Sequence, residues 1–339
     1  MTPIDLRSDT MTRPTRAMRR AMAEAEVGDD LWGEDPTVNR LQEKAAALLG
    51  FEAALYVATG TMANEIAIRL LVLPGQFVVA EERSHVIEYE MAGMAVLSGA
   101  LARSLPSADG KLWPAAMRAV AKAPGINRPA VGMVVLENTH NLAGGTVSTS
   151  PEMREAIATA RELGWNVHVD GARLFNAAVA LGVPARELVE GADTVMIALS
   201  KGLCCPIGSI LASSADRIRE ARRIRSQFGG GWRQAGIVAA AGLVALDSMI
   251  PRLADDHANA RLLAEALASR RGIEVIAPET NIVVGRIPSG TAGAAAEALK
   301  PHGVLAVPMD ATTLRFVTHH DVSRDDCLRA ADAIRQALP

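Results

Sequence analysis

Short apolar runs alternate with longer stretches of helical periodicity along most of this 339-residue chain. Strand-like runs occur at 55–58, 76–80, 132–136, 166–170, 194–199 and 209–212. Between them, apolar residues recur at helical spacing, as at 36–49, where Gly50 is the predicted stop. Alternation of this kind with nearly continuous apolar strands is typical of a parallel or mixed sheet covered by helices on both faces. The sequence therefore predicts an α/β fold.

Two further helices have recognisable starts. Ser84 is a plausible N-cap for a helix over 85–98, and Ser150-Pro151 is expected to cap and begin a helix that Gly164 ends. A third helix is expected to open at Gly60-Thr61.

The pattern of predicted helices and strands changes near residue 251, where Pro251 interrupts a long helical region. Strands are then expected at 273–276, 281–287, 304–308 and 313–318, and helices at 291–300 and 323–338. We therefore predict two closely packed domains, a large one over 1–250 and a small α+β domain over 251–339.

Composition excludes several classes of protein. Hydrophobic residues make up 49% and charged residues 22%, enough for a large core. A net charge of −3 gives no reason to expect a nucleic-acid partner, and no apolar run approaches the ~18–20 residues of a membrane span. The first residues lack a signal-peptide layout, and three cysteines form neither a disulfide framework nor a metal site. We expect a cytoplasmic protein without a metal.

Polar residues that directly follow strands are the candidates for chemistry, because ligands of open α/β sheets gather at the carboxyl ends of the strands. Four sets fit this description: 59–61 (Thr-Gly-Thr), 84–85 (Ser-His), 170–173 (Asp-Gly-Ala-Arg) and 200–202 (Ser-Lys-Gly).

The set at 200–202 alone contains a lysine, and this is informative because the chain has only five lysines. Four of them have a solvated-surface explanation, whereas Lys201 follows the apolar run 195–199. A lysine at a partly dry strand end can have its pKa lowered enough to act as an amine nucleophile. Taken alone, however, Lys201 could equally cap its strand and meet solvent.

Three other positions complement Lys201. Asp170 could keep a pyridine nitrogen protonated, or cap the following turn. Gly60-Thr61 could present a helix N-terminus to a phosphate, and His85 could stack on a ring, act as a base, or lie at the surface. Together these residues supply what a pyridoxal-phosphate site needs: an amine, a pyridinium partner, a phosphate cradle and a ring-facing base.

Several ordered motifs now identify a family. They are Arg7-Ser8-Asp9-Thr10, Gly33-Glu34-Asp35-Pro36-Thr37, Thr59-Gly60-Thr61-Met62-Ala63-Asn64, Leu136-Glu137-Asn138-Thr139-His140-Asn141, His168-Val169-Asp170-Gly171-Ala172-Arg173, Ser200-Lys201-Gly202-Leu203, Gly229-Gly230-Gly231 and Arg233-Gln234-Ala235-Gly236. Over nearly its whole length the chain resembles the low-specificity threonine aldolases, which are pyridoxal-phosphate enzymes of fold type I. The resemblance implies a large mixed-sheet, three-layer domain, a small C-terminal domain, and an N-terminal segment, 1–15, that contributes to the active site.

The resemblance also implies a role for each matching residue. Lys201 would carry the cofactor, Asp170 would face its pyridine nitrogen, and His85 would stack on its ring. Gly60 and Thr61 would hold the phosphate, with Arg233 reaching it from a neighbouring subunit of a homotetramer. Ser8, Arg173 and Arg315 would bind the carboxylate of a β-hydroxy-α-amino acid, which the enzyme would cleave to glycine and an aldehyde.

Three positions depart from the family pattern. Trp32 stands where the family usually has tyrosine, Asn127 where an ungapped count places a second active-site histidine, and Ser226 where a phosphate-side lysine is usual. Arg225, beside Ser226, could compensate for that lysine. These departures leave the side-chain preference of the enzyme open.

Other functions remain as alternatives. The nearest is a pyridoxal-phosphate β-eliminating lyase or racemase that acts on a different bond. A nucleotide-binding module is disfavoured because neither a Rossmann nor a P-loop glycine motif is present. A non-catalytic protein that retains the fold is disfavoured by the presence of both Lys201 and Asp170.

Overall fold

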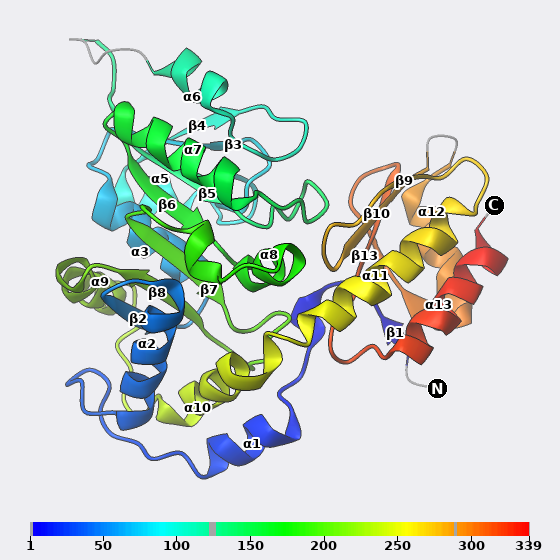
Figure 1. Ribbon diagram of the computed structural model, residues 1–339, viewed down its shortest axis with the longest axis horizontal. Helices are drawn as coiled ribbons and strands as arrows, with labels where there is room; N and C mark the ends of the chain where they lie inside the picture. The colour runs from blue at the N-terminus through cyan, green and yellow to red at the C-terminus, as the bar shows by residue number, and fades with distance from the viewer. Residues whose placement is uncertain (1–2, 122–126, 288–289, 339) are drawn as a thin grey trace.

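The computed structural model describes residues 3–121, 127–287 and 290–338. Figure 1 shows a larger lobe built around one sheet and a smaller lobe that contains the C-terminal helices. The large sheet has the strand order β2-β8-β7-β6-β5-β3-β4. Its strands are Ala53–Val57 (β2), Phe77–Glu81 (β3), Leu101–Leu105 (β4), Val131–Glu137 (β5), Asn166–Asp170 (β6), Thr194–Ala198 (β7) and Ser209–Ser213 (β8). Strand β8 runs antiparallel to β7 and β2, whereas β4, β3, β5, β6 and β7 are parallel, so the sheet is mixed.

Helices cover both faces of this sheet, because successive residues of each apolar strand point to opposite sides. Tyr56 packs in one core cluster, whereas its neighbours Leu55 and Val57 pack in another. The first face carries α1 (Arg16–Ala23), α2 (Pro36–Leu49), α6 (Pro114–Val120), α7 (Ser150–Glu162), α8 (Leu174–Leu181) and α10 (Gly236–Val244). The second carries α3 (Gly60–Leu71), α4 (His85–Glu88), α5 (Gly93–Ser98) and α9 (Ala215–Gln227). The predicted three-layer α/β architecture is confirmed.

The small lobe contains an antiparallel sheet with its own core. Its strands, in the order β12-β13-β10-β9, are Val307–Pro308, Thr313–Val317, Ile282–Arg286 and Glu274–Ile276. Helices α11 (Leu253–Ala268), α12 (Ala292–Leu299) and α13 (Arg324–Ala337) pack against it. The predicted strand at 304–308 is divided into β11 (Val304–Leu305) and β12.

The N-terminal segment packs with this C-terminal lobe, although it precedes the large lobe in sequence. Strand β1 (Ile4–Asp5) pairs in parallel with β11, and Ile4 and Leu6 are buried in the core of the small lobe. The chain then crosses to α1 in the large lobe, which Figure 1 shows in blue. The structural unit of the small lobe therefore includes residues that the sequence assigns to the domain 1–250.

The ends of helices α2 and α7 show which capping residues predicted from the sequence are correct. Asp35 caps α2 by accepting hydrogen bonds from the N–H groups of Thr37 and Val38, and Gly50 ends the helix with φ of 75°. Helix α7 begins at Ser150 as predicted, but Thr149 is its N-cap, in a capping box with Glu152.

The predicted helix over 85–98 is wrong in one respect. It is divided into α4 and α5, because Met91 and Ala92 adopt left-handed φ angles of 54° and 57°. Ser84 stands at the N-cap position but makes no side-chain capping bond. The break turns the side chain of Glu90 inward, where it is 3% exposed.

No single helix of the described ranges is long and apolar enough to cross a membrane. Two consecutive helical segments, Gly236–Met249 and Leu253–Ala268, are together long and apolar enough by length and composition only, and they are bent by 69° relative to each other.

Candidate active site

The carboxyl ends of β2, β3, β5, β6 and β7 lie at one edge of the large sheet because β8 alone in this sheet runs against them. Two adjoining cavities, of about 140 and 380 Å³, lie at this edge. They are lined by every predicted site residue except Arg233, namely Ser8, Gly60, Thr61, His85, Asp170, Arg173, Lys201 and Arg315. The topology thus brings together residues from both ends of the sequence.

Lys201 follows β7 and lines both cavities. Its backbone carbonyl accepts a hydrogen bond of 2.9 Å from the hydroxyl of Thr12, which holds the loop that follows β7 against the N-terminal segment. Desolvation, together with the positive charge of Arg173, lowers the pKa of Lys201 below its ordinary value. A lowered pKa increases the share of free amine, the form that attacks a carbonyl.

Asp170 ends β6 and is 2% exposed. Its Oδ1 accepts a hydrogen bond from the N–H of Ala172, and its Oδ2 accepts one of 2.8 Å from Asn64 Nδ2. The carbonyl oxygen of Asn64 contacts Nε2 of His168 at 2.9 Å. Burial lowers the pKa of His168 to about 4, so this ring is neutral near pH 7. The carboxylate of Asp170 is therefore held by a chain of neutral polar groups.

His85 begins α4 and lies within reach of two carboxylates. Its backbone N–H donates to Glu137 Oε2 at 2.8 Å, and its Nδ1 lies 2.8 Å from Glu90 Oε1. Burial alone would lower the pKa of His85, but the hydrogen bond with Glu90 and the charge of Asp170 outweigh it and raise the pKa. The ring is thus poised to hold or transfer a proton near neutral pH.

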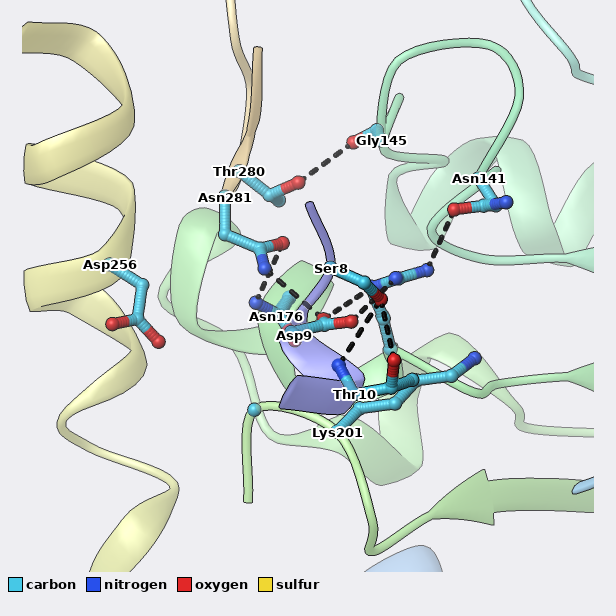
Figure 2. Close-up of polar contacts among 12 residues, drawn as sticks. Ser8, Asp9, Thr10, Asn141, Gly145, Asn176, Lys201, Asp256, Thr280 and Asn281 are labelled. Carbon is cyan, nitrogen blue, oxygen red and sulfur yellow. Dashed lines mark hydrogen bonds and ion pairs between the residues drawn. The ribbon is translucent and has the colours of Figure 1, made fainter. Parts of the chain in front are cut away.

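Arg173 is held by Asp9 in a buried, two-point ion pair. Arg173 Nε and Nη2 donate to the two oxygens of Asp9 at 2.7 and 2.8 Å. Asn281, from the small lobe, donates to the same carboxylate at 3.2 Å, as Figure 2 shows. Burial would raise the pKa of Asp9, but the charge and hydrogen bonds of Arg173 outweigh it, so the pKa lies well below its usual range.

A second arginine faces the same cavity from β13. Arg315 Nη1 contacts Asn141 Oδ1 at 3.4 Å, and Arg173 Nη1 donates to that oxygen at 3.1 Å. The Nε of Arg315 is buried and has no hydrogen-bond partner among the described residues. Ser8 lies nearby as the N-cap of a short 3-10 turn, Asp9–Met11, where its hydroxyl accepts from Thr10. Two guanidinium groups thus converge where an anion could bind.

The start of α3 forms the far end of the smaller cavity. Thr59 caps the helix by accepting from the N–H of Met62, which leaves the first turn of N–H groups at Gly60 and Thr61. A Cβ at position 60 would lie 2.5 Å from the methyl group of Met196, so a larger residue there would require the flexible Met196 side chain to shift. The hydroxyl of Ser209, beside Gly60, is buried and has no partner in the described structure.

Several expected residues lie elsewhere in this chain. Arg233 is exposed and pairs with Asp29 at 3.5 Å, and Trp32 is 77% exposed. Asn127 is exposed in a turn before β5, at the amino end of the strand whose carboxyl end carries Glu137, so it takes no part in the site of its own chain.

The suggestion that Arg225 compensates for Ser226 is wrong. Arg225 is fully buried, and its guanidinium binds Asp30 at 2.5 Å and the carbonyl of Tyr56 at 2.8 Å. Ser226 is exposed and its hydroxyl donates to the carbonyl of Arg222.

Sequence reasoning gave no role to several residues that shape the site: Asp9, Asn64, Glu90, Glu137 and Asn281. Asp9, Asn64 and Glu137 belong to motifs that were recognised, so a signal existed for them. Glu90 carried none, because it lies within a stretch that reads as one continuous helix.

The fold of this chain is that of pyridoxal-phosphate enzymes of fold type I. Threonine aldolase from Leishmania major superposes with a TM-score of 0.85 at 20% identity, over 98% of this chain and 99% of that one. Serine palmitoyltransferase from Sphingomonas wittichii gives a TM-score of 0.78 at 18% identity, over 99% and 89%.

Sequence comparison narrows this class to a family. The model of the β-eliminating lyase family matches residues 5–288. Low-specificity L-threonine aldolase 1 from Arabidopsis thaliana is 39% identical over 100% of this chain and 97% of its own length. The low-specificity L-threonine aldolase of Escherichia coli K12 is 42% identical over 97% of each chain. The chain belongs to the β-eliminating lyase family and, within it, to the low-specificity L-threonine aldolases.

Proposed function

We propose that this protein is a pyridoxal-phosphate-dependent aldolase that cleaves threonine, allo-threonine and related β-hydroxy-α-amino acids to glycine and an aldehyde. The observation that carries the proposal is the placement of Lys201, with its lowered pKa, beside Asp170 and the paired arginines Arg173 and Arg315. Family membership over the full chain supports the same conclusion.

The residues present fit the cofactor. Lys201 supplies the amine, and Asp170 an ionisable partner for a ring nitrogen. Gly60 and Thr61 offer helix N–H groups to a phosphate, and the unpartnered hydroxyl of Ser209 lies beside them. Bound there, pyridoxal phosphate would supply an electrophilic carbon for amines and a conjugated ring that accepts electrons.

The arginines would fix the amino-acid substrate. Arg173 and Arg315 would bind its carboxylate, with Ser8 as an additional donor. The side-chain oxygen of Asn141 contacts both guanidinium groups and so holds them next to each other. A fixed carboxylate orients the Cα–Cβ bond for cleavage, and orientation of this kind can lower a barrier by several kcal/mol, up to about 7–11 in the best cases. His85 would take the proton of the β-hydroxyl group.

The assembly is also part of the proposal. We infer a cytoplasmic homotetramer, a dimer of dimers, in which Arg233 reaches the phosphate site of a neighbouring subunit. Its exposure, and its absence from the lining of the two cavities, support this arrangement.

A second candidate is a β-eliminating lyase, because that is the description of the family model that matches residues 5–288. Such an enzyme would yield a keto acid and ammonia. The converging arginines serve both reactions, so the products must decide between them.

The first experiment is the visible absorption spectrum of the purified protein, before and after addition of glycine, followed by product analysis with threonine. A yellow protein whose band responds to glycine, and which forms glycine and acetaldehyde from threonine, supports the aldolase. A colourless protein that also ignores added pyridoxal phosphate would contradict the cofactor assignment. Light scattering on the same sample tests the tetramer.

A further inference from the structure

We propose that Glu90 is a positioning residue that accepts a hydrogen bond from Nδ1–H of His85 and so keeps the proton on Nδ1, which leaves Nε2 of His85 as the atom that accepts the substrate proton. The inference rests on the proposed function and deepens it. It assigns a role to a buried residue in the break between α4 and α5.

The contacts of Glu90 define this role. Its Oε1 lies 2.8 Å from His85 Nδ1 and 2.8 Å from Asn64 Nδ2. Single side-chain polar atoms of His85, Glu90 and Asp170 lie within 4.8 Å of one another. Glu90 is 3% exposed, so water does not screen its interaction with the imidazole.

The amide of Asn64 has only one orientation that satisfies its neighbours. Its two Nδ2 hydrogens point to Glu90 and Asp170, and its Oδ1 accepts from Nε2–H of the neutral His168 ring. The Oδ1 of Asn64 can only accept, so Nε2 of His168 carries the proton, and the hydroxyl of Thr194, 2.7 Å from Nδ1, can donate to the lone pair there. The hydrogen bond from this amide favours the ionised form of Glu90, against the desolvation that raises the Glu90 pKa.

The proton on His85 is fixed in turn. An ionised carboxylate can only accept a hydrogen bond, so Nδ1 of His85 must carry the proton in this contact. In the neutral ring, Nε2 then has a free lone pair. The same logic orients the histidine of a serine-histidine-aspartate triad.

Other charged groups surround this pair. Asp170 adds negative charge and Lys201 positive charge to the environment of the imidazole, and Glu137 accepts from the His85 backbone. Glu65, on α3, is buried near Glu90, and burial together with the charge of Glu90 raises its pKa to about 8. Glu65 is therefore mostly neutral near pH 7. Burial and the charge of Asp170 raise the pKa of Glu90 above its ordinary value, whereas the hydrogen bonds with His85 and Asn64 oppose this shift. The proposed role requires that Glu90 is ionised in its contact with His85.

Nε2 of His85 takes the β-hydroxyl proton, and the O–H electron pair forms the carbonyl bond of the aldehyde. The Cα–Cβ electron pair stays with the glycine fragment, whose Cα later receives a proton from solvent. The imidazolium returns its own proton to solvent, so the reaction consumes no net proton. The Glu90 carboxylate stabilises the imidazolium while it exists.

The first test is a titration of His85 by NMR, in the cofactor-loaded and cofactor-free protein, with ¹³C-labelled histidine and assignment by His85→Asn. We expect Glu90→Gln to lower the pKa of His85 by about one unit or more, because a carboxylate within ~4–6 Å is lost. The matched control, Glu65→Gln, should leave that pKa unchanged between pH 6 and 7.5. An unchanged His85 pKa in Glu90→Gln would overturn the proposal.

The second test is kinetic. Glu90→Gln should lower kcat for threonine cleavage about tenfold or more and move the acid limb of the pH profile with the His85 pKa, while KM and cofactor absorbance stay within about twofold. In a His85→Asn background the same change should have little further effect. Additive losses would mean that Glu90 acts by another route.

Two controls keep the outcomes separate. If thermal unfolding shows that Glu90→Gln folds poorly, Glu90→Asp provides a second variant that retains the carboxylate. It should keep the His85 pKa above the ordinary histidine value of about 6.5. A His85 pKa at that ordinary value in Glu90→Asp would contradict the proposal. A wild-type protein that cleaves no β-hydroxy-α-amino acid would refute the proposed function, whereas the titration would still test the link between Glu90 and His85.

Discussion

Asp9 and Arg173 form the most consequential residue pair of the site. Asp9 is fully buried, Arg173 is 6% exposed, and the two are joined by two hydrogen bonds. Breaking one partner of a buried pair is costly because it leaves the other charge without compensation in a dry environment. The pair also fixes the plane of the guanidinium that we propose binds the substrate carboxylate.

We therefore expect Asp9→Asn to destabilise the protein by about 3–5 kcal/mol and to raise KM for threonine more than it lowers kcat. Urea unfolding and steady-state kinetics measure the two effects. The control is Asp216→Asn, which removes an exposed pair with Arg219 and should change stability by less than about 1 kcal/mol. Equal KM values for wild type and Asp9→Asn would show that Arg173 does not depend on Asp9 for its position.

At the scale of elements, the turn between α4 and α5 carries the clearest backbone strain. Met91 and Ala92 both have left-handed φ angles, a conformation that costs about 1–2 kcal/mol for residues other than glycine. Met91 is 91% exposed, so packing does not explain its presence. The turn directs Glu90 toward His85, and we infer that the strain is retained because it serves this placement.

Met91→Gly should therefore be more stable than Met91→Ala by about 0.5–1 kcal/mol, since glycine relieves the strain but costs entropy in the unfolded chain. The alanine variant is the matched control, because both changes remove the same exposed side chain. Thermal or urea unfolding of the two variants gives the difference. A glycine variant no more stable than the alanine variant would mean that the turn imposes no strain at position 91.

Elements and site were predictable from the sequence where a local signal existed. Apolar runs placed the strands of the large sheet except β4, whose residues are mostly exposed, and the polar residues after the strands placed Lys201, Asp170 and His85 at one sheet edge. The break at Met91 and Ala92 was not predictable, because neither residue is a usual turn former. Nor was the burial of Arg225, since only the tertiary contact with Asp30 and the Tyr56 carbonyl decides it. Strand β1, two residues long, depends entirely on its distant partner β11.

At the scale of the whole molecule, the N-terminal segment joins the two lobes across the site. Leu6 is buried in the small-lobe core, Asp9 binds Arg173 of the large lobe, and Thr12 donates to the carbonyl of Lys201. A second connection lies beside it, where Asn176 of α8 contacts His257 of α11 and Asn281. The junction between the lobes is therefore built from buried polar contacts.

His257 makes this junction sensitive to acid. It is 3% exposed, and its Nε2 lies 3.2 Å from Asn176 Nδ2, as an acceptor in the neutral ring. Burial and the charges of Arg261 and Arg252 lower its pKa to about 4, against about 6.5 in the unfolded chain. Between these values the unfolded state binds more protons, so the contribution of His257 to stability is complete above pH 6.5 and is lost as the pH falls toward 4.

His257→Gln isolates this contribution. Glu65, whose pKa is raised to about 8 by burial and the charge of Glu90, changes stability in the opposite sense over part of the same range. The contribution of Glu65 to the free energy of unfolding is the same in wild type and His257→Gln, so it cancels when the two proteins are compared. We expect the stability of His257→Gln relative to wild type to improve by about 1.2 kcal/mol as the pH falls from 6 to 5. Urea unfolding of the cofactor-free proteins at each pH measures it, and parallel curves would show that His257 does not stay neutral in the folded state.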